Sequence, residues 1–334
     1  MSLEKLSDQP LFTGDGPTHE ATFRSLVEYG RPVARFDRPR ATSPTTLGVV
    51  SDPHIAVDAS GTWKMYHRSR ERFRETLVAL EREEVDALVI TGDLTKDGEE
   101  RNLDWMQSVL DDVPMVVVPG NHDVKEVSVE RFERRFTENG FPIRKRLDGL
   151  DVLGLNSAMT PGTGDVERGV VSDAQLDWLE ETLPTATDPI VVTHHNLPGL
   201  HDHIGGHGWT PYPPVGNADA LLDVLSCHDV PLHLSGHVHL LSLLWNSGVR
   251  GFVAPPLSSF PQAYALLDVD ASGTTVRCRT AASQEDIEEA YADSQAHSVR
   301  SGVIARLNAK QLRSLPLVDE RVDAADDIRS IHRQ

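Results

Sequence analysis

The sequence of 334 residues has few cysteines and no long apolar run. Cys227 and Cys278 are its only cysteines, which excludes a disulfide framework and a cysteine-rich zinc site. No stretch approaches the roughly 18 consecutive apolar residues of a transmembrane helix. The polar start, MSLEKLSDQPLFTGDG, lacks the apolar core of a signal peptide. We therefore expect a cytoplasmic protein with no membrane partner.

Lysine is scarce as well, and acidic residues outnumber basic ones. The chain has 6 lysines and 26 arginines, and its 51 acidic residues against 32 basic ones give a net charge of −19. This composition favours adaptation to concentrated salt, where screening weakens the repulsion between like charges. An ordinary acidic cytosolic protein is the alternative. The acidic surface argues against nucleic acid as a partner, although salt adaptation weakens this argument because it makes every surface acidic.

Apolar strand patterns alternate with amphipathic helical patterns through the middle of the chain. Strands are expected at 45–52, 85–93, 113–123, 151–157, 189–196 and 230–239. Helices are expected at 67–84, 99–112, 172–183 and 217–228. The nearly continuous apolar strands indicate an α/β domain whose sheet is covered on both faces. Two later strand patterns flank Ala-Ser-Gly and predict a β-hairpin.

The two ends of the chain lack this alternation. We expect residues 1–44 to form an extended N-terminal segment and residues 45–282 to form the α/β domain. Residues 283–334 are expected to be an acidic, partly helical tail that packs on the domain or extends it. Capping the domain and mediating a homo-oligomer are both open roles for this tail.

Polar side chains that can bind metal follow five of the expected strands. They are Asp52, His54, Asp93, Asn121, His122, His194, His237 and His239. Ligands of open α/β sheets bind outside the carboxyl ends of strands, so we expect these side chains to converge. Oxygen and imidazole ligands suit Mn, Fe, Zn or Ni. These side chains are too many to bind a single ion. A pair of ions that share a bridging carboxylate is the arrangement used for in-line displacement at phosphorus.

Each of these motifs taken singly has a structural alternative. Asp and His often cap turns, Gly-Asn can form a turn, and His194 alone could be a packed core histidine. The ordered set of five motifs, each directly after an apolar strand, is harder to explain by turn chemistry. We therefore interpret the set as a metal site.

The motifs DPH, GDLTKDG, GNHD, HHN and GHVH, spread over residues 52–239, resemble those of the calcineurin-like metallophosphoesterase superfamily. They are most similar to its class III cyclic-nucleotide phosphodiesterase and glycerophosphodiesterase branch. The resemblance implies a four-layer α/β/β/α sandwich of two mixed sheets, with two divalent metal ions at the carboxyl ends of the strands.

The same resemblance implies a metal-dependent phosphoric ester hydrolase. A phosphodiesterase is favoured, acting on cyclic nucleotides or other small phosphodiesters by in-line attack of a hydroxide that bridges the metals. A phosphomonoesterase acting on nucleotides or phosphoproteins is the first alternative. A non-catalytic scaffold with this fold is the second, although such scaffolds have lost ligand residues and this chain has every one.

Roles for the motif residues follow from the resemblance. The implied ligands are Asp52, His54 and His239 for the first metal, Asp93 for both, and Asn121, His194 and His237 for the second. His122 would lie beside the substrate phosphate, where it would stabilise the transition state or protonate the leaving oxygen. Asp123 would orient His122, or it would be an ordinary loop acid.

Three features near the HHN motif bear on the substrate. His195 and Asn196 are expected near the substrate, since Asn196 replaces the proline common in this branch. The stretch 199–216 is rich in His and Gly and is either a substrate loop or a solvated excursion. If it contacts substrate, His201, His203 and His207 are the candidates. The natural substrate and the metal identity stay open at this stage.

Overall fold

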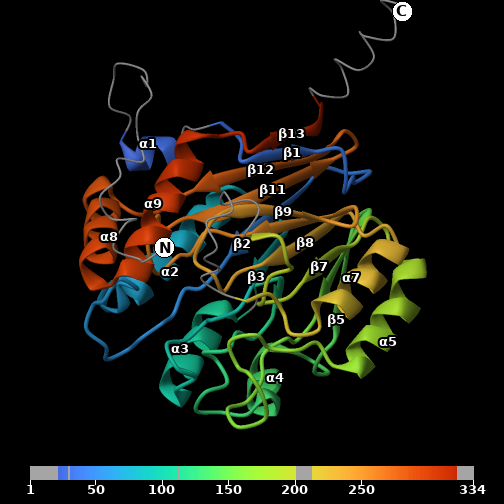
Figure 1. Cartoon of the computed structure of the whole chain (residues 1–334), viewed down its shortest axis with the longest axis horizontal. Coiled ribbons are helices and arrows are strands. Elements are labelled where there is room, and N and C mark those ends of the chain that lie inside the picture. Colours follow the sequence, from blue (N-terminus) through green and yellow to red (C-terminus); the bar gives the residue numbers. More distant parts are fainter. Residues whose placement is uncertain (1–21, 29–30, 112, 201–212, 322–334) are drawn as a thin grey trace, which may run out of the picture.

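A computed structural model of the chain describes residues 22–28, 31–111, 113–200 and 213–321, and its strands form two sheets (Figure 1). The first sheet has seven strands in the order β13 (Val318–Asp319), β1 (Ala34–Phe36), β12 (Gly273–Arg279), β11 (Tyr264–Asp270), β2 (Thr45–Val50), β3 (Ala87–Ile90) and β4 (Met115–Val117). The neighbours β2, β3 and β4 are parallel, whereas β11 is antiparallel to both β2 and β12. The sheet is therefore mixed.

The second sheet has six strands and is mixed as well. Its order is β5 (Ile143–Leu147), β6 (Leu150–Gly154), β7 (Ile190–Val192), β8 (Leu232–Ser235), β10 (Val249–Val253) and β9 (Ser242–Asn246). The four strands from β6 to β10 are parallel, and β5 and β9 pair with them as antiparallel edge strands. Parallel strands aligned in this way end at the same edge of the sheet.

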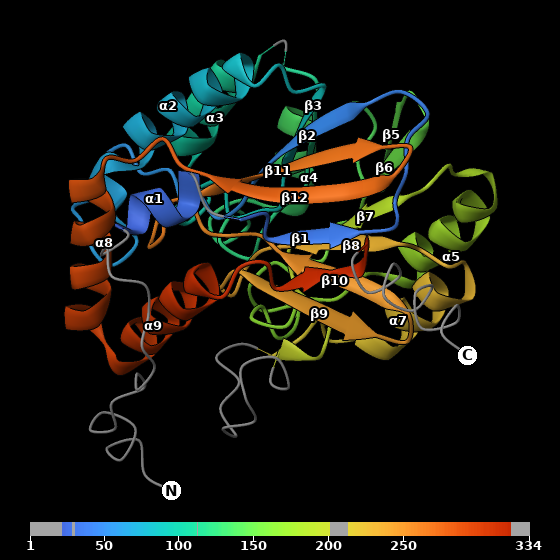
Figure 2. The ribbon, with the colours of Figure 1, turned by 90° about the horizontal axis from the view of Figure 1, so that it is seen from above.

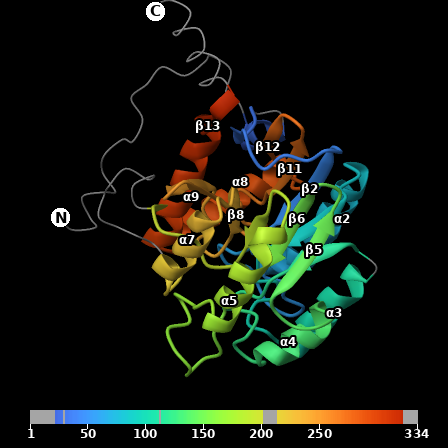
Figure 3. The same ribbon diagram turned by 90° about the vertical axis from the view of Figure 1, so that its right-hand side faces the viewer.

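Helices cover the outer face of each sheet (Figure 2). The helices on the first sheet are α2 (Ser69–Arg82), α3 (Glu100–Leu110) and α4 (Val129–Phe136). Those on the second sheet are α5 (Asp173–Thr182) and α7 (Ala218–Cys227), which lie side by side in Figure 3. Two short 3₁₀ helices, Tyr66–Arg68 and Leu183–Thr185, adjoin α2 and α5. The fold is thus the four-layer α/β/β/α sandwich that the sequence predicts.

The apolar strands supply three separate cores, because successive side chains of a strand point to opposite faces. In β3, Val89 packs between the two sheets, while Leu88 and Ile90 pack under α2 and α3. In β7, Ile190 and Val192 face the first sheet, while Val191 packs under α5 and α7. Burial of both faces explains why these strands are continuous apolar runs.

A third group of helices packs at one end of the sandwich (Figure 2). It consists of α1 (Phe23–Glu28), α8 (Gln284–His297) and α9 (Val299–Arg313), and α1 contacts both of the others. Arg72 of α2 is 4% exposed and ties α8 down through an ion pair of 2.6 Å with Asp286. Both α8 and α9 belong to the C-terminal segment that begins at residue 283.

The expected strands and helices between residues 45 and 282 are present, although several strands are shorter than expected, as β4 is, and β11 and β12 form the expected hairpin. Sequence analysis does not assign the elements α4, β5 and β9. Within the segment 1–44, α1 forms a helix and β1 pairs with β12. The domain boundaries at 44 and 282 stay predictions. None of the described helices is long and apolar enough to cross a membrane.

Candidate metal centre

The ends of five strands from both sheets bring the expected ligand side chains together. Asp52 and His54 follow β2, Asp93 follows β3 and Asn121 follows β4, all in the first sheet. The second sheet supplies His194 after β7 and both His237 and His239 after β8. Side chains from these strand ends form three groups of three, and within each group the potential ligand atoms lie within 4.8 Å of one another. The convergence expected from the strand ends is therefore present.

The backbone at these strand ends has an unusual conformation. Of the expected ligands, five have positive φ angles: Asp52 (51°), His54 (43°), Asp93 (52°), His237 (68°) and His239 (53°). Left-handed backbone is uncommon outside glycine, although Asp and His tolerate it better than most residues. Strain of this kind clusters at functional sites, where it turns a side chain in a direction that a regular strand cannot give.

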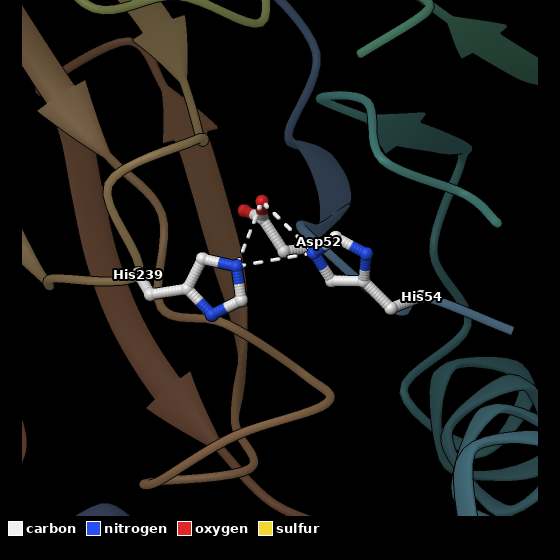
Figure 4. Close-up of side chains that lie close together, drawn as sticks. All are labelled: Asp52, His54 and His239. Carbon is white, nitrogen blue, oxygen red and sulfur yellow. Dashed lines mark hydrogen bonds and ion pairs between the residues drawn. The ribbon is translucent and has the colours of Figure 1, made fainter. Parts of the chain in front are cut away.

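The first group is formed by Asp52, His54 and His239 (Figure 4). The Nε2 atoms of His54 and His239 are 3.1 Å apart, and His239 Nε2 is 3.3 Å from Asp52 Oδ1. This carboxylate oxygen is fully buried and accepts no hydrogen bond from any described residue. A buried carboxylate oxygen without a donor, facing two imidazole nitrogens, fits a site that takes a cation.

Asp93 lies between this group and a second one. Its Oδ2 is 3.4 Å from His54 Nε2, and its Oδ1 is 3.5 Å from His194 Nε2. The main-chain N–H of His122 donates a hydrogen bond of 2.9 Å to Oδ1, which fixes the orientation of the carboxylate. The two oxygens of one side chain thus face histidines on opposite sides.

The second group is formed around the Asn121 amide oxygen. This Oδ1 atom is 3.2 Å from His194 Nε2 and 3.2 Å from His237 Nδ1. The other ring nitrogen of His194, Nδ1, donates a hydrogen bond of 2.8 Å to the Thr91 carbonyl. That bond keeps the proton on Nδ1, so the Nε2 lone pair faces the site. His239 is oriented similarly by a contact of 2.8 Å between its Nδ1 and Ser259 Oγ.

The electrostatics hold these groups in the protonation states that bind metal. Burial lowers the pKa values of His54, His237 and His239, which favours neutral imidazoles. Burial alone would raise the pKa of Asp93, but the nearby His194, His122 and Lys64 lower it overall. The pKa of Asp52 is likewise lowered, since His239 outweighs the effect of burial. Ionised carboxylates with neutral imidazoles fit divalent metal ions.

A glycine allows the loop after β4 to approach Asp93. A Cβ atom on Gly120 would overlap both the carboxylate and the main-chain nitrogen of Asp93. The Pro119-Gly120 turn therefore brings Asn121 and His122 against the end of β3, and only glycine leaves the necessary space.

His122 points from this loop into a polar surrounding that the motifs alone did not reveal. Its Nδ1 contacts the Lys96 carbonyl and lies 3.4 Å from the Asp97 carboxylate. Its Nε2 is 3.3 Å from Lys64 Nζ. Asp97 belongs to the GDLTKDG stretch, so the carboxylate beside His122 comes from a different strand end than expected. His122 also lies close enough to His54 and Asp93 to form a third possible metal group.

Asp123 turns away from His122. One carboxylate oxygen accepts hydrogen bonds from the Leu94 and Gly120 N–H groups, and the other accepts from the N–H and hydroxyl of Thr95, all at 2.8–3.0 Å. This buried carboxylate clamps the loop after β3 to the loop after β4. The contacts favour the loop-acid interpretation of Asp123, because no described contact links its side chain to the His122 ring.

The residues expected near the substrate have other surroundings. The His195 side chain is fully buried between Ser157 and the Val166 carbonyl. Its Nδ1 lies 2.9 Å from Ser157 Oγ. Burial lowers the pKa of His195 to about 3. The Asn196 amide is buried and donates to the Leu197 carbonyl. Neither side chain lines the cleft, although the His195 ring lies directly behind the cleft residue His237, with ring centroids 4.6 Å apart. His201, His203 and His207 lie outside the described residues.

A cleft of about 290 Å³ opens over the metal groups. Of the expected site residues, it is lined by Asp93, Asn121, His122 and His237. Sequence analysis missed the rest of the lining: Trp63, Lys64, Glu167, His297, Ser298, Arg300 and Ser301. The scarcity of lysine could have singled out Lys64, which burial holds at a pKa of about 8. No motif indicates that the junction of α8 and α9 forms a wall of the cleft.

Comparisons with known proteins give a consistent result. The sequence profile of the calcineurin-like phosphoesterase family matches residues 45–241. The 3',5'-cyclic adenosine monophosphate phosphodiesterase CpdA of Escherichia coli K12 is 28% identical over 235 residues, which cover 67% of this chain and 78% of that protein. A protein named probable glycerophosphodiester phosphodiesterase GpdQ, from Arcobacter nitrofigilis, is 33% identical over 185 residues, or 51% of this chain and 63% of that protein.

Among solved structures, a dimetal phosphatase from Danio rerio matches with a TM-score of 0.55 and 16% identity. The match covers 71% of this chain and 99% of that one. At this identity the likeness supports the fold alone.

Proposed function

The chain belongs to the calcineurin-like phosphoesterase family, and we propose that within it this protein is a phosphodiesterase acting on small phosphodiesters, with cyclic nucleotides the first candidates. The broader class, a metal-dependent phosphoric ester hydrolase, follows from the family and from phosphodiesterase relatives. The relatives' names motivate the substrate proposal. A cleft of about 290 Å³ is also suited to a small molecule.

The observation that carries the proposal is the position of Asp93. One of its oxygens faces His54 and the other faces His194, so a single carboxylate can serve two ions. We infer two divalent ions, drawn from Mn, Fe, Zn or Ni. The first would be held by Asp52, His54, His239 and Asp93, and the second by Asp93, Asn121, His194 and His237. When bound, such a pair supplies Lewis-acid stabilisation of phosphoryl charge and activates water.

The protein's own groups then orient the substrate and move protons. His122 reaches the cleft with Nε2 while its Nδ1 donates to the Lys96 carbonyl. The Asp97 carboxylate lies 3.4 Å from Nδ1, on the side of the ring that faces away from the cleft. We propose that His122 gives the Nε2 proton to the leaving oxygen of the ester. The Asn121 amide is neutral, which limits the negative charge that an approaching phosphate meets.

The test compares a diester with a monoester substrate. The protein is stripped with chelator, reloaded with manganese or, in parallel samples, with Fe, Zn or Ni, and assayed in molar KCl with bis-p-nitrophenyl phosphate and with p-nitrophenyl phosphate. We expect hydrolysis that depends on metal and prefers the diester, after which cyclic nucleotides are screened. A preference for the monoester would move the assignment to a phosphomonoesterase. Inactivity with all four metals on both substrates would contradict the proposal and favour a non-catalytic scaffold.

A further inference from the structure

Three of the chain's 6 lysines surround the His122 side chain. Lys64 Nζ lies 3.3 Å from its Nε2, Lys125 Nζ lies 2.9 Å from its Nδ1, and the Lys96 carbonyl contacts Nδ1. They come from three separate loops. Lys64 and Lys125 place their ammonium groups beside the ring, whereas Lys96 contacts it through its main-chain carbonyl.

Two of these lysines have a carboxylate partner within the protein. Lys96 Nζ forms an ion pair with Asp97, and Lys125 Nζ lies 3.1 Å from the other oxygen of the same carboxylate. Both side chains are about one-third exposed. Their charges are thus balanced by Asp97 and by solvent, and they need no further partner.

Lys64 differs in both respects. It is only 9% exposed, and within the described part of the chain no carboxylate forms an ion pair with its ammonium group. The groups within hydrogen-bond distance are two imidazole nitrogens, His54 Nε2 at 3.0 Å and His122 Nε2 at 3.3 Å. A buried ammonium without a close carboxylate is costly, and Asp93 and Asp52 attract this one only from beyond ion-pair distance, so an anion in the cleft would stabilise it further.

The position of Lys64 indicates where that partner lies. Its side chain lines the cleft together with Asp93, Asn121 and His122. One oxygen atom can lie within hydrogen-bond distance of both His122 Nε2 and Lys64 Nζ, because the two nitrogens are 3.3 Å apart. Ammonium groups donate strong, charge-assisted hydrogen bonds to phosphate oxygens.

We propose that Lys64 is a phosphate-binding residue of this cleft, whose ammonium donates to a phosphoryl oxygen of the substrate or product next to His122. This inference rests on the proposed function, because it assigns Lys64 to the same reaction. The competing role is structural: Lys64 would only hold His54 in place. The two roles differ in what they predict for the binding of free phosphate.

The experiment measures binding of inorganic phosphate by isothermal titration calorimetry. Wild type, Lys64→Met and the control Lys310→Met are reloaded with manganese, and their metal content per chain is measured. Lys310 is exposed on α9, away from the cleft lining. We expect Lys64→Met to weaken phosphate binding about tenfold or more at equal metal content, since a charged hydrogen bond is lost. Unchanged affinity in Lys64→Met would overturn the proposal.

A second measurement uses the wild-type protein and does not depend on the folding of a variant. Lysines are acetylated under limiting reagent with and without inorganic phosphate, and the labelled peptides are quantified by mass spectrometry. We expect phosphate to slow the labelling of Lys64 severalfold relative to Lys310. Equal labelling rates with and without saturating phosphate would contradict the proposal.

These readouts separate the inference from the proposed function. A protein that binds phosphate through Lys64 but hydrolyses no ester would refute the function and leave the inference standing. Diester hydrolysis by a wild type whose phosphate affinity is unaffected in Lys64→Met would refute the inference and leave the function standing.

Discussion

Asp93 links two groups of side chains that would otherwise be separate sites. Replacing it with asparagine removes a charge and one ligand oxygen. We expect Asp93→Asn to bind at least one metal ion fewer per chain and to lose about 100-fold or more in rate, because even outer contacts of metal sites are worth 10- to 100-fold. Elemental analysis and diester hydrolysis measure both effects.

The control for this change is Asp268→Asn, which alters a carboxylate on β11 that pairs with Arg277. We expect it to retain wild-type metal content and rate. An Asp93→Asn protein with full metal content and activity would show that this carboxylate does not bridge two ions.

His122 is expected to act on the substrate without holding metal. We expect His122→Ala to keep its metal content and to lose about 10²- to 10⁴-fold in rate, the usual contribution of a positioned acid or base. The loss should be larger for an alkyl ester than for a p-nitrophenyl ester, since an alkoxide leaving group needs the proton more. Equal losses on both esters would contradict a proton-donor role, and loss of metal would place His122 among the ligands.

Asp123 can be tested for the two roles that the sequence left open. Its carboxylate accepts three main-chain N–H bonds and one hydroxyl bond, so Asp123→Asn would set an amide N–H against one of these donors. We expect a loss of about 1–3 kcal/mol in the free energy of unfolding. Urea unfolding of the metal-free protein at fixed salt measures it. A stable variant that has lost only rate would instead support an orienting role for Asp123.

At the scale of strands and helices, the burial pattern of the sandwich made much of the fold predictable. Strands such as β3 and β7 are buried on both faces, so their sequences are unbroken apolar runs that end at a polar ligand. The edge strand β5 (IRKRL) is only partly buried and reads as a charged segment, so sequence analysis did not assign it. The cleft wall at the junction of α8 and α9 depends on tertiary packing, which leaves no local signal.

In the candidate site, too, some residues have a local sequence pattern and others are placed by tertiary packing alone. Its ligand types follow strand ends and could be located from the sequence. The scarcity of lysine could have drawn attention to Lys64, but its contacts with His54 and His122 depend on tertiary packing. His195 was expected near substrate because it adjoins His194, but alternate residues after a strand face different ways, and its ring packs inward against Ser157.

Strand β8 carries a buried histidine that should make the protein sensitive to acid. His233 contacts Thr193 Oγ1 at 2.9 Å, and burial lowers its pKa to about 3. The folded state therefore keeps it neutral, whereas the unfolded chain binds a proton below about pH 6.5. Its contribution to stability is complete above that pH and is lost as the pH falls toward 3, by about 2 kcal/mol at pH 5.

Between about pH 7.5 and pH 5, we expect the free energy of unfolding to fall less for His233→Gln than for wild type. The difference should be up to about 2 kcal/mol. Urea unfolding of metal-free proteins at both pH values measures the difference. His228→Gln, at the half-buried end of α7, is the matched control and should follow wild type. Parallel pH profiles for wild type and His233→Gln would contradict the expectation.

For the whole molecule, the net charge of −19 sets an expectation about salt. The Debye length falls from about 10 Å at 0.1 M salt to about 3 Å at 1 M, so repulsion across an acidic surface is strongest in dilute buffer. We expect the melting temperature to rise between these concentrations of KCl. Sucrose, which is uncharged, serves as the control for solute effects. A melting temperature that is constant or falls in KCl would support an ordinary acidic protein instead.

The division of the ligands between the two sheets also bears on how the protein is made. The ligand residues after β2, β3 and β4 leave the ribosome long before His194, His237 and His239. Residues that meet in the site can be far apart in the sequence, since Asp52 and His239 are separated by 187 positions. A growing chain therefore carries half a metal site until β8 has emerged. With the proposed ligands, complete metal loading would have to wait for nearly three-quarters of synthesis, and the ions would then cross-link the early half of the chain to the late half.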